Sequence, residues 1–305
     1  MSKKPNFFMV GAPKCGTTAL SEYLREHPNI FMSTPKEPHY FATDMEGYRF
    51  VKTENDYLGL FGNVTKEHKA IGEASVYYLY SKDAIKNIFA YNKEAKIIIM
   101  LRNPVEMVYS LHSQLVESAN EDVRDFMTAW ELVEKRKSGD MLPENSKDHK
   151  VLFYDEIGKY NEQLENVYKY FNSEQVKIIL FDDFKVNTKK IYEEILEFLN
   201  VPQDNRGKFP IINENAEPRN FWLNSLMKKQ PKLLEITINK LKLILGIKQS
   251  GIGKMIISMN TKKAKRKILS DTLKQEVYKN YEPDIFKLSK LLNIDLINWK
   301  NKRST

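Results

Sequence analysis

The sequence has little cysteine, no long apolar run and fewer acidic than basic residues. Its single cysteine, Cys15, excludes an intramolecular disulfide and is compatible with a reducing compartment. No apolar segment approaches the roughly 20 residues that span a bilayer, and no signal-peptide core with a cleavage site is visible. The sequence therefore argues against an integral membrane protein and predicts a cytoplasmic location.

The charge balance is basic, with 48 lysines and arginines against 40 acidic residues and a formal net charge of +8. An excess of this kind favours anionic ligands such as nucleotides, acidic glycans, nucleic acid or a membrane surface. An ordinary lysine-rich surface explains the bulk charge equally well, because only clustered charge identifies a partner. The 305 residues, 42% of them hydrophobic, are enough for one large core or two small ones.

Residues 6–20 combine a buried strand, a tight loop and the start of a helix. The apolar run 7–10 is typical of a strand that is covered on both faces. Gly11 and Gly16 bracket a loop whose backbone can approach a ligand closely, because glycine has no Cβ. A helix is expected over residues 17–27. Its first N–H groups and the positive end of its dipole predict an anion site.

The spacing of this loop resembles the P-loop pattern G-x-x-x-x-G-K-[ST], with the lysine displaced. Gly11, Gly16 and Thr18 are in register with the pattern. Thr17 takes the lysine position, and the cation is Lys14 instead. A nucleoside triphosphatase needs its lysine on the β- and γ-phosphates and an acidic residue for Mg²⁺. The loop therefore predicts a phosphate ligand with a different reacting centre, or else an ordinary strand–turn–helix with an incidental lysine.

A second informative stretch covers residues 30–41, where a short apolar strand leads into a loop that contains Pro35 and Pro38. Proline limits the backbone and so fixes the direction of neighbouring side chains. Glu37 or His39 could act there as a general base, with nearby aromatic residues restricting water. A solvated turn is the alternative.

The third stretch is the apolar run 97–101, the clearest buried strand of the chain, which ends at Arg102. Open α/β sheets bind ligands at the carboxyl ends of their strands. A guanidinium at that edge suits a phosphate, where a Walker B strand would have an aspartate for Mg²⁺. Pro104 begins a helix, and Ser110 lies about two turns along it on the face toward Arg102. Arg102 capping a carbonyl and Ser110 packing in the core is the alternative.

The order of elements predicts the fold class. Residues 69–78 form a brief strand and loop, and residues 82–91 form a helix, as in the β-α units that build parallel sheets. We expect an α/β, three-layer, P-loop-like fold with a central parallel sheet flanked by helices. A single domain over residues 1–305 is predicted, with a helical insertion at about 118–155 and a helical C-terminal part at about 220–305.

Two segments are less specific. Residues 123–137 predict one amphipathic helix inside the insertion. Residues 231–259 form a Leu/Ile/Lys amphipathic segment, which is followed by the basic run 262–267. A helix packed on the sheet is favoured for this segment, and peripheral contact with a membrane or a partner is the alternative.

Three ordered motifs resemble the sulfotransferases that use 3′-phosphoadenosine 5′-phosphosulfate (PAPS), and in particular the glycan-modifying, heparan-sulfate-type and bacterial branch. The motifs are residues 13–18, residues 36–41, and residues 101–104 with Ser110. Residues 176–184, 191–201 and 281–299 resemble the late strand with its acidic turn, the helix after it and the last helix of the family.

The resemblance implies roles for the site residues. Lys14 would stabilise the bridging oxygen as it leaves, and Glu37 would be the base for the acceptor hydroxyl or amine. His39 competes with Glu37 for that role. Arg102 and Ser110 would bind the 3′-phosphate. The residues implied in donor binding are Lys14, Cys15, Gly16, Thr17, Thr18, Ala19, Arg102 and Ser110.

The remaining donor contacts and the acceptor are left open by the resemblance. Residues 213–220, with Arg219, or the basic run 262–267 would complete the 3′-phosphate site. No metal is expected to be required, since a sulfate monoester carries less charge than a terminal phosphate. No nucleic-acid partner is expected either. A saccharide or glycolipid acceptor is favoured. A small phenol, alcohol or amine as the acceptor, a P-loop nucleotide kinase, and a non-catalytic nucleotide binder are the alternatives, and oligomeric state is not predicted.

Overall fold

The computed structural model describes residues 4–212, 216–218, 261–263 and 269–301 of the chain. The chain forms two compact units. The first comprises Met1–Leu111, Phe153–Asn213 and Leu269–Thr305, and the second comprises His112–Leu152 and Glu214–Ile268. The candidate site residues from Lys14 to Ser110 belong to the first unit. The single domain expected from the sequence stays a prediction.

A five-stranded parallel sheet with the order β2-β3-β1-β4-β5 is the centre of the first unit. Its strands are β1 (Phe7–Gly11), β2 (Ile30–Met32), β3 (Ala70–Ala74), β4 (Lys96–Leu101) and β5 (Val176–Leu180). The apolar runs of β1 and β4 follow from their burial on both faces. The ring of Phe7 lies 2.2 Å from where a Cβ on Gly72 would be, so this pairing of β1 with β3 requires glycine.

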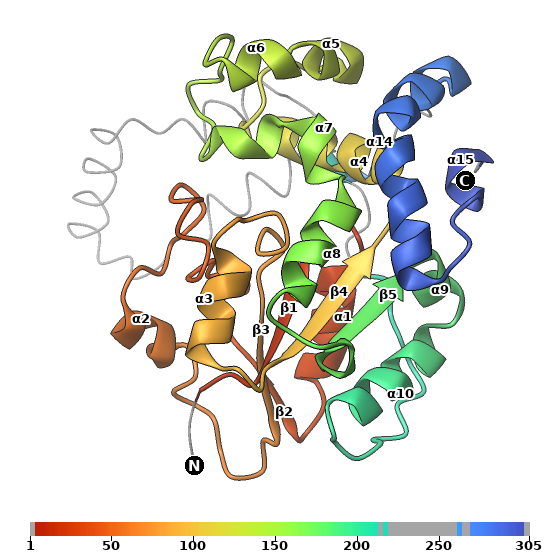
Figure 1. Cartoon of the computed structure of the whole chain (residues 1–305). Coiled ribbons are helices and arrows are strands. Elements are labelled where there is room, and N and C mark those ends of the chain that lie inside the picture. The colour runs from red at the N-terminus through yellow and green to blue at the C-terminus, as the bar shows by residue number, and fades with distance from the viewer. Residues whose placement is uncertain (1–3, 213–215, 219–260, 264–268, 302–305) are drawn as a thin grey trace, which may run out of the picture. The chain divides into compact units, whose positions relative to one another are not determined.

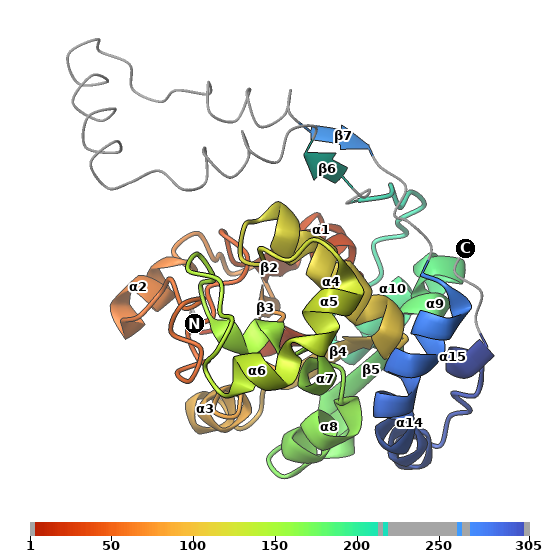
Figure 2. The same cartoon turned by 90° about the horizontal axis from the view of Figure 1, so that it is seen from above.

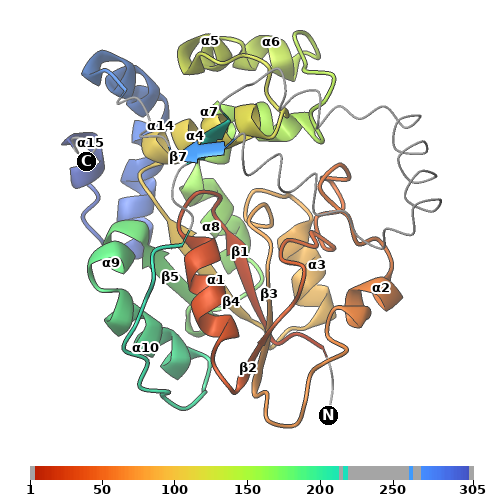
Figure 3. The ribbon, with the colours of Figure 1, turned by 180° about the vertical axis from the view of Figure 1, so that it is seen from behind.

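Helices cover both faces of this sheet, which gives three layers (Figure 1). One face carries α3 (Ala84–Tyr91), α8 (Tyr160–Tyr168) and α14 (Asp271–Leu292). The other face carries α1 (Thr17–Arg25) and α10 (Thr188–Phe198), as Figure 3 shows from behind and Figure 2 from above. The predicted α/β three-layer fold with a central parallel sheet is confirmed.

The first unit also contains shorter helices, and one of its long helices caps the N-terminus of another. The shorter helices are α2 (Glu54–Gly59), α7 (Tyr154–Ile157), α9 (Phe181–Val186), α15 (Asn298–Asn301) and the 3₁₀ helix η2 (Ser173–Gln175). Asp284 of α14 accepts hydrogen bonds from the backbone N–H of Asn161, at 3.0 Å, and of Glu162, at 3.4 Å. A carboxylate at a helix N-terminus satisfies free donors, so α14 caps α8.

Helix α4 (Pro104–Glu117) begins in the first unit and ends in the second. The described part of the second unit contains α5 (Phe126–Glu131), α6 (Val133–Lys137), η1 (His149–Leu152) and an antiparallel pair, β6 (Ala216–Pro218) and β7 (Thr261–Lys263). Its buried Arg136 donates to both carboxylate oxygens of Glu121, at 2.6 and 2.7 Å.

Two of the expectations from the sequence concern residues of this second unit. The single helix expected over residues 123–137 is wrong, because α5 begins only at Phe126 and α6 is a separate helix. Asp125 accepts a hydrogen bond from the N–H of Thr128 at 2.9 Å, and this cap sets the start of α5. The amphipathic segment 231–259 lies outside the described residues.

Candidate active site

The loop between β1 and α1 has the backbone geometry of an anion cradle. Gly16 is the residue before α1 and has a φ of 88°, in the left-handed region. A Cβ on Gly16 would lie 3.0 Å from the ring of Phe181, so the loop requires glycine there. Lys14 also has a positive φ, of 60°. The first turn of α1 contains no acidic residue, so its free N–H groups face no competing carboxylate from that turn.

The side chains of the loop divide into buried and accessible ones. Cys15 and Thr17 are buried, whereas Lys14, Thr18 and Ala19 are partly exposed. Burial raises the pKa of the Cys15 thiol to about 12, and its Sγ donates to the carbonyl of Pro13 at 3.3 Å. Cys15 therefore offers a ligand its backbone and not a reactive thiol. Because Thr17 is buried, the position of the Walker lysine does not present a side chain to a phosphate.

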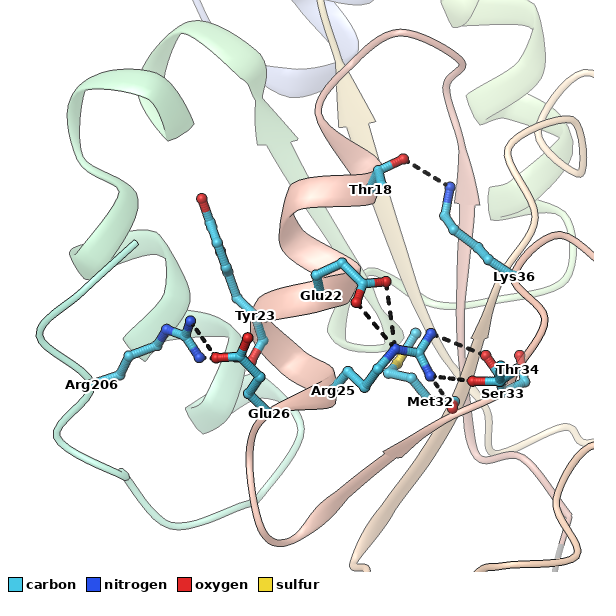
Figure 4. A network of polar contacts seen from close by, with 10 residues as sticks. All are labelled: Thr18, Glu22, Tyr23, Arg25, Glu26, Met32, Ser33, Thr34, Lys36 and Arg206. Atoms are coloured by element: carbon cyan, nitrogen blue, oxygen red, sulfur yellow. Dashed lines mark hydrogen bonds and ion pairs between the residues drawn. The ribbon is translucent and has the colours of Figure 1, made fainter. Parts of the chain in front are cut away.

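The loop after β2 places Glu37 beside the start of α1. Lys36 joins the two, since its Nζ lies 2.6 Å from Oε1 of Glu37 and 3.3 Å from Oγ1 of Thr18. Figure 4 shows this lysine reaching Thr18. Glu37 and His39 have φ values of 63° and 50°. Non-glycine residues in this region are strained, and strain of this kind gathers at functional sites.

The surroundings of Glu37 keep its carboxyl ionised. Burial raises the pKa of Glu37, but the interaction with His39 and the positive charge of Lys36 outweigh it and lower that pKa to about 2. Nε2 of His39 lies 3.5 Å from Oε2 of Glu37. The chain thus presents a carboxylate with two basic groups in contact with it.

Glu37 and His39 differ in their access to solvent. The side chain of Glu37 is 34% exposed, and that of His39 is 3% exposed. The His39 ring lies within 6.0 Å of the rings of Tyr48, Tyr77 and Tyr78, and neither of its nitrogens has a hydrogen-bond partner of normal geometry among the described residues. This arrangement gives Glu37 the better access to an acceptor and leaves His39 behind it.

Arg102 follows β4, which pairs with β1 in the sheet, so Arg102 stands beside the loop between β1 and α1, residues 12–16, which is the candidate donor loop. Its Nη1 donates to the carbonyl of Lys14 at 3.4 Å, and its guanidinium lies over the Phe181 ring at 4.9 Å. Its Nε and Nη2 donate to one oxygen of Glu106, at 3.0 and 2.9 Å. Ser110 is buried one turn beyond Glu106 on α4.

The structure brings most of the proposed residues to the carboxyl edge of the sheet. Lys14 and Arg102 are joined through the Lys14 carbonyl, and Thr18 and Glu37 through Lys36. The roles assigned to these residues stay predictions. The late-loop candidates within 213–220 and 262–267 lie largely outside the described residues.

Two contacts at this edge were not foreseen from the sequence. Lys36 is adjacent to Glu37 within the pair of prolines, and that adjacency was its only signal. Glu106 lies four residues after Arg102, the spacing at which helical charges meet. Lys36 already pairs with Glu37, the proposed base, and Glu106 already pairs with Arg102, the proposed phosphate ligand. Both charges therefore alter the electrostatics of the site.

Two kinds of feature are absent from the described residues. No group of three or more histidine, cysteine, aspartate or glutamate side chains among them is placed to hold a metal ion. In the same part of the chain, no helix is long and apolar enough to cross a membrane.

The central parallel sheet, with helices on both faces and a glycine-bounded loop between its strand β1 and helix α1, places the chain in the P-loop-like α/β class. The family model of the sulfotransferase domain matches residues 4–232. Since this match covers well over half of the chain, the chain belongs to the sulfotransferase family.

The relatives of the chain include glycan-modifying and bacterial sulfotransferases. Carbohydrate sulfotransferase 15 of Mus musculus is 28% identical over 246 residues, which cover 65% of this chain and 44% of that protein. Bifunctional heparan sulfate N-deacetylase/N-sulfotransferase 1 of Caenorhabditis briggsae is 25% identical over 216 residues, covering 66% of this chain and 23% of that protein. The chain thus spans less than half the length of these two relatives. The crystal structure of a sulfotransferase from Alicyclobacillus acidocaldarius is similar with a TM-score of 0.70 and 26% identity, covering 97% of this chain and 99% of that one.

Proposed function

We propose that this chain transfers the sulfuryl group of PAPS to a hydroxyl or amino group of a saccharide acceptor. Membership of the sulfotransferase family supports the reaction class. The glycan-acting relatives support a saccharide, since one is named a carbohydrate sulfotransferase and another acts on heparan sulfate. The observation that carries the proposal is the meeting of the donor loop, Arg102 and Glu37 at one sheet edge.

The residues of the cradle fit such a donor. The loop around Gly16 admits a ligand close to the backbone, and a Cβ there would already crowd Phe181. Partly exposed Lys14 and Thr18 supply a cation and a hydroxyl at the helix start. Arg102 supplies a planar fork of donors for a second phosphate, with buried Ser110 a turn beyond its partner Glu106.

PAPS supplies an activated sulfuryl group whose leaving group is adenosine 3′,5′-bisphosphate (PAP). Glu37 takes the proton of the acceptor while the acceptor oxygen or nitrogen bonds to sulfur and the bond from sulfur to the bridging oxygen breaks. Lys14 stabilises the negative charge that appears on that bridging oxygen. The protein thus contributes alignment and charge stabilisation rather than a covalent intermediate.

Replacing Glu37 by glutamine tests the assignment of the base, because the amide keeps the shape of the side chain and cannot accept the proton. We expect Glu37→Gln to bind PAP with wild-type affinity and to lose sulfuryl transfer by about a hundredfold or more. Transfer from radiolabelled PAPS to desulfated glycans, glycolipids and phenols gives the readout and also identifies the acceptor. Retained transfer in Glu37→Gln would move the base to His39.

Other properties expected from the sequence stay predictions. These are a cytoplasmic location, peripheral contact with a membrane, and the absence of a metal and of a nucleic-acid partner.

A further inference from the structure

Two backbone hydrogen bonds join the segment that carries Glu37 to strand β3. The N–H of Ser33 donates to the carbonyl of Gly72 at 2.9 Å, and the N–H of Glu37 donates to the carbonyl of Ala74 at 3.0 Å. Pro35, which lies between these two bonds, has no N–H to offer. Side chains that reach the segment from other elements therefore add to these two bonds in fixing its place.

Arg25 reaches this segment from the last turn of α1. Its Nη1 donates to the carbonyl of Met32 at 2.7 Å and to Oγ1 of Thr34 at 2.6 Å. Its Nη2 donates to the carbonyl of Ser33 at 3.1 Å. Figure 4 shows the guanidinium facing these three consecutive residues.

The chemistry of this contact requires arginine. Three acceptors on successive residues match the fixed fork of a guanidinium, and a lysine ammonium is a single point charge that cannot reproduce the fork. The Arg25 side chain is also oriented by Glu22, whose Oε1 lies 3.4 Å from Nε. Charge-assisted bonds of this kind are stronger than neutral ones.

Helix α1 touches both halves of the site. Its first turn follows the donor loop and carries Thr18, which accepts from Lys36 at 3.3 Å. Its last turn carries Arg25, which holds residues 32–34. One helix therefore links the donor loop to the segment of Glu37 at two points.

We propose that Arg25 is a positioning residue, which sets the place of Glu37 relative to the donor loop by holding Met32, Ser33 and Thr34. The inference rests on the proposed function. In-line transfer needs reacting atoms at close range and aligned, and a shift of about 1 Å can cost about a hundredfold in rate. Arg25 acts through the loop and touches no reacting atom.

The chain offers a matched control on the same helix. Arg206 pairs with Glu26 at 2.7 Å, and its guanidinium lies 5.1 Å from the centre of the Tyr23 ring. Figure 4 shows Arg206 on the side of α1 away from residues 32–34. Arg206→Met therefore removes an arginine that braces the same end of α1 and leaves the Glu37 segment untouched.

The experiment compares Arg25→Met, Arg25→Lys and Arg206→Met in PAPS-dependent transfer to desulfated heparan sulfate and in PAP binding. We expect Arg25→Met to lower kcat by about tenfold or more, with Arg25→Lys intermediate. The Kd for PAP should stay within about twofold in all three variants, and Arg206→Met should keep kcat within about twofold of wild type, because a positioning role leaves donor binding intact. A kcat of Arg25→Met within that range, or an equal loss in Arg206→Met, would overturn the inference, and so would a parallel loss of PAP affinity.

A second readout needs no acceptor. Hydrogen exchange at the amides of Ser33 and Glu37 should quicken in Arg25→Met and stay unchanged in Arg206→Met. Thr34→Val removes one acceptor from an exposed position and should quicken the same amides, even if Arg25→Met fails to fold. Unchanged exchange in these variants contradicts the inference. A wild-type protein that neither binds PAP nor uses PAPS contradicts the proposed function instead.

Discussion

At the scale of single residues, Glu37 is already a carboxylate before an acceptor arrives. Burial opposes this by raising its pKa, but His39 and Lys36 bring the pKa down to about 2. A carboxylate whose ionised form is stabilised so strongly is a weak base, because base strength falls as the pKa falls. Lys36 also touches Thr18 of the donor loop, so a ligand that draws Lys36 toward the loop would strengthen Glu37 as a base.

Removing the charge of Lys36 should therefore be visible in the pH profile. Lys36→Met takes away a cation that stabilises the ionised form, so the pKa of Glu37 should rise toward its ordinary value of 4.5. In kcat/KM measured from pH 4 upward, we expect the wild type to show no titration of Glu37. The variant should lose activity as pH falls through the raised pKa, and a profile identical to wild type would contradict this account.

Sequence patterns singled out residues whose signal is local and missed residues whose partners are distant in the sequence. The displaced Lys14 and the strand-end Arg102 were visible because each stands next to a strong strand or turn pattern. Arg25 carries no such signal, since its acceptors are backbone carbonyls that become neighbours only after β2 folds against α1. Contacts of this kind depend on tertiary packing and leave no regular residue spacing in the sequence that would predict them.

At the scale of secondary-structure elements, β3 contains an unusual residue for a buried strand. Glu73 is fully buried, and its burial raises the pKa of its carboxyl to about 7, with the hydroxyls of Tyr57 and Tyr78 offsetting part of the shift. A pKa that is higher in the folded than in the unfolded state means that the folded protein binds the proton more tightly. Folding stability from Glu73 is therefore present at low pH and lost as pH rises from about 4.5 to about 7.

Unfolding of Glu73→Gln by urea at pH 5 and pH 7.5 tests this sign. The glutamine does not titrate, so the difference between the two proteins isolates the contribution of Glu73. Relative to the variant, the wild type should lose about 2 kcal/mol of unfolding free energy between pH 5 and pH 7.5. A difference that is the same at both pH values would show that Glu73 has an ordinary pKa.

Strands were predicted better than helix boundaries. The apolar run at 97–101 forms β4, Lys96–Leu101, because a short continuous apolar run is typical of a parallel strand buried on both faces. The single helix expected at 281–299 by resemblance is instead α14, Asp271–Leu292, followed by the separate short helix α15, Asn298–Asn301. The start of α14 is set by Ser270, whose side chain accepts from the N–H of Leu273, and Pro283 lies in its interior. Proline usually lies in the first turn of a helix, and here it lies two turns or more after the start.

At the scale of the whole molecule, the strand order explains why the distant motifs meet. The donor loop follows β1, and Arg102 follows the neighbouring β4. Glu37 follows β2, and its N–H bonds to the carbonyl of Ala74 at the end of β3. Alternating strands and helices allowed the fold class to be predicted. The order of the strands did not follow from the sequence, because pairing between distant segments depends on the folded core.

The central claim is that Lys14 acts on the leaving oxygen and Arg102 on donor binding, and one paired measurement tests it. Radiolabelled transfer from PAPS and calorimetric binding of PAP are compared for Lys14→Ala and Arg102→Ala. We predict that Lys14→Ala loses about a hundredfold or more in turnover and keeps PAP affinity within about threefold. Arg102→Ala should weaken PAP binding by about tenfold or more, because a charged fork to a phosphate is lost. Undiminished PAPS-dependent transfer by Lys14→Ala would contradict the account.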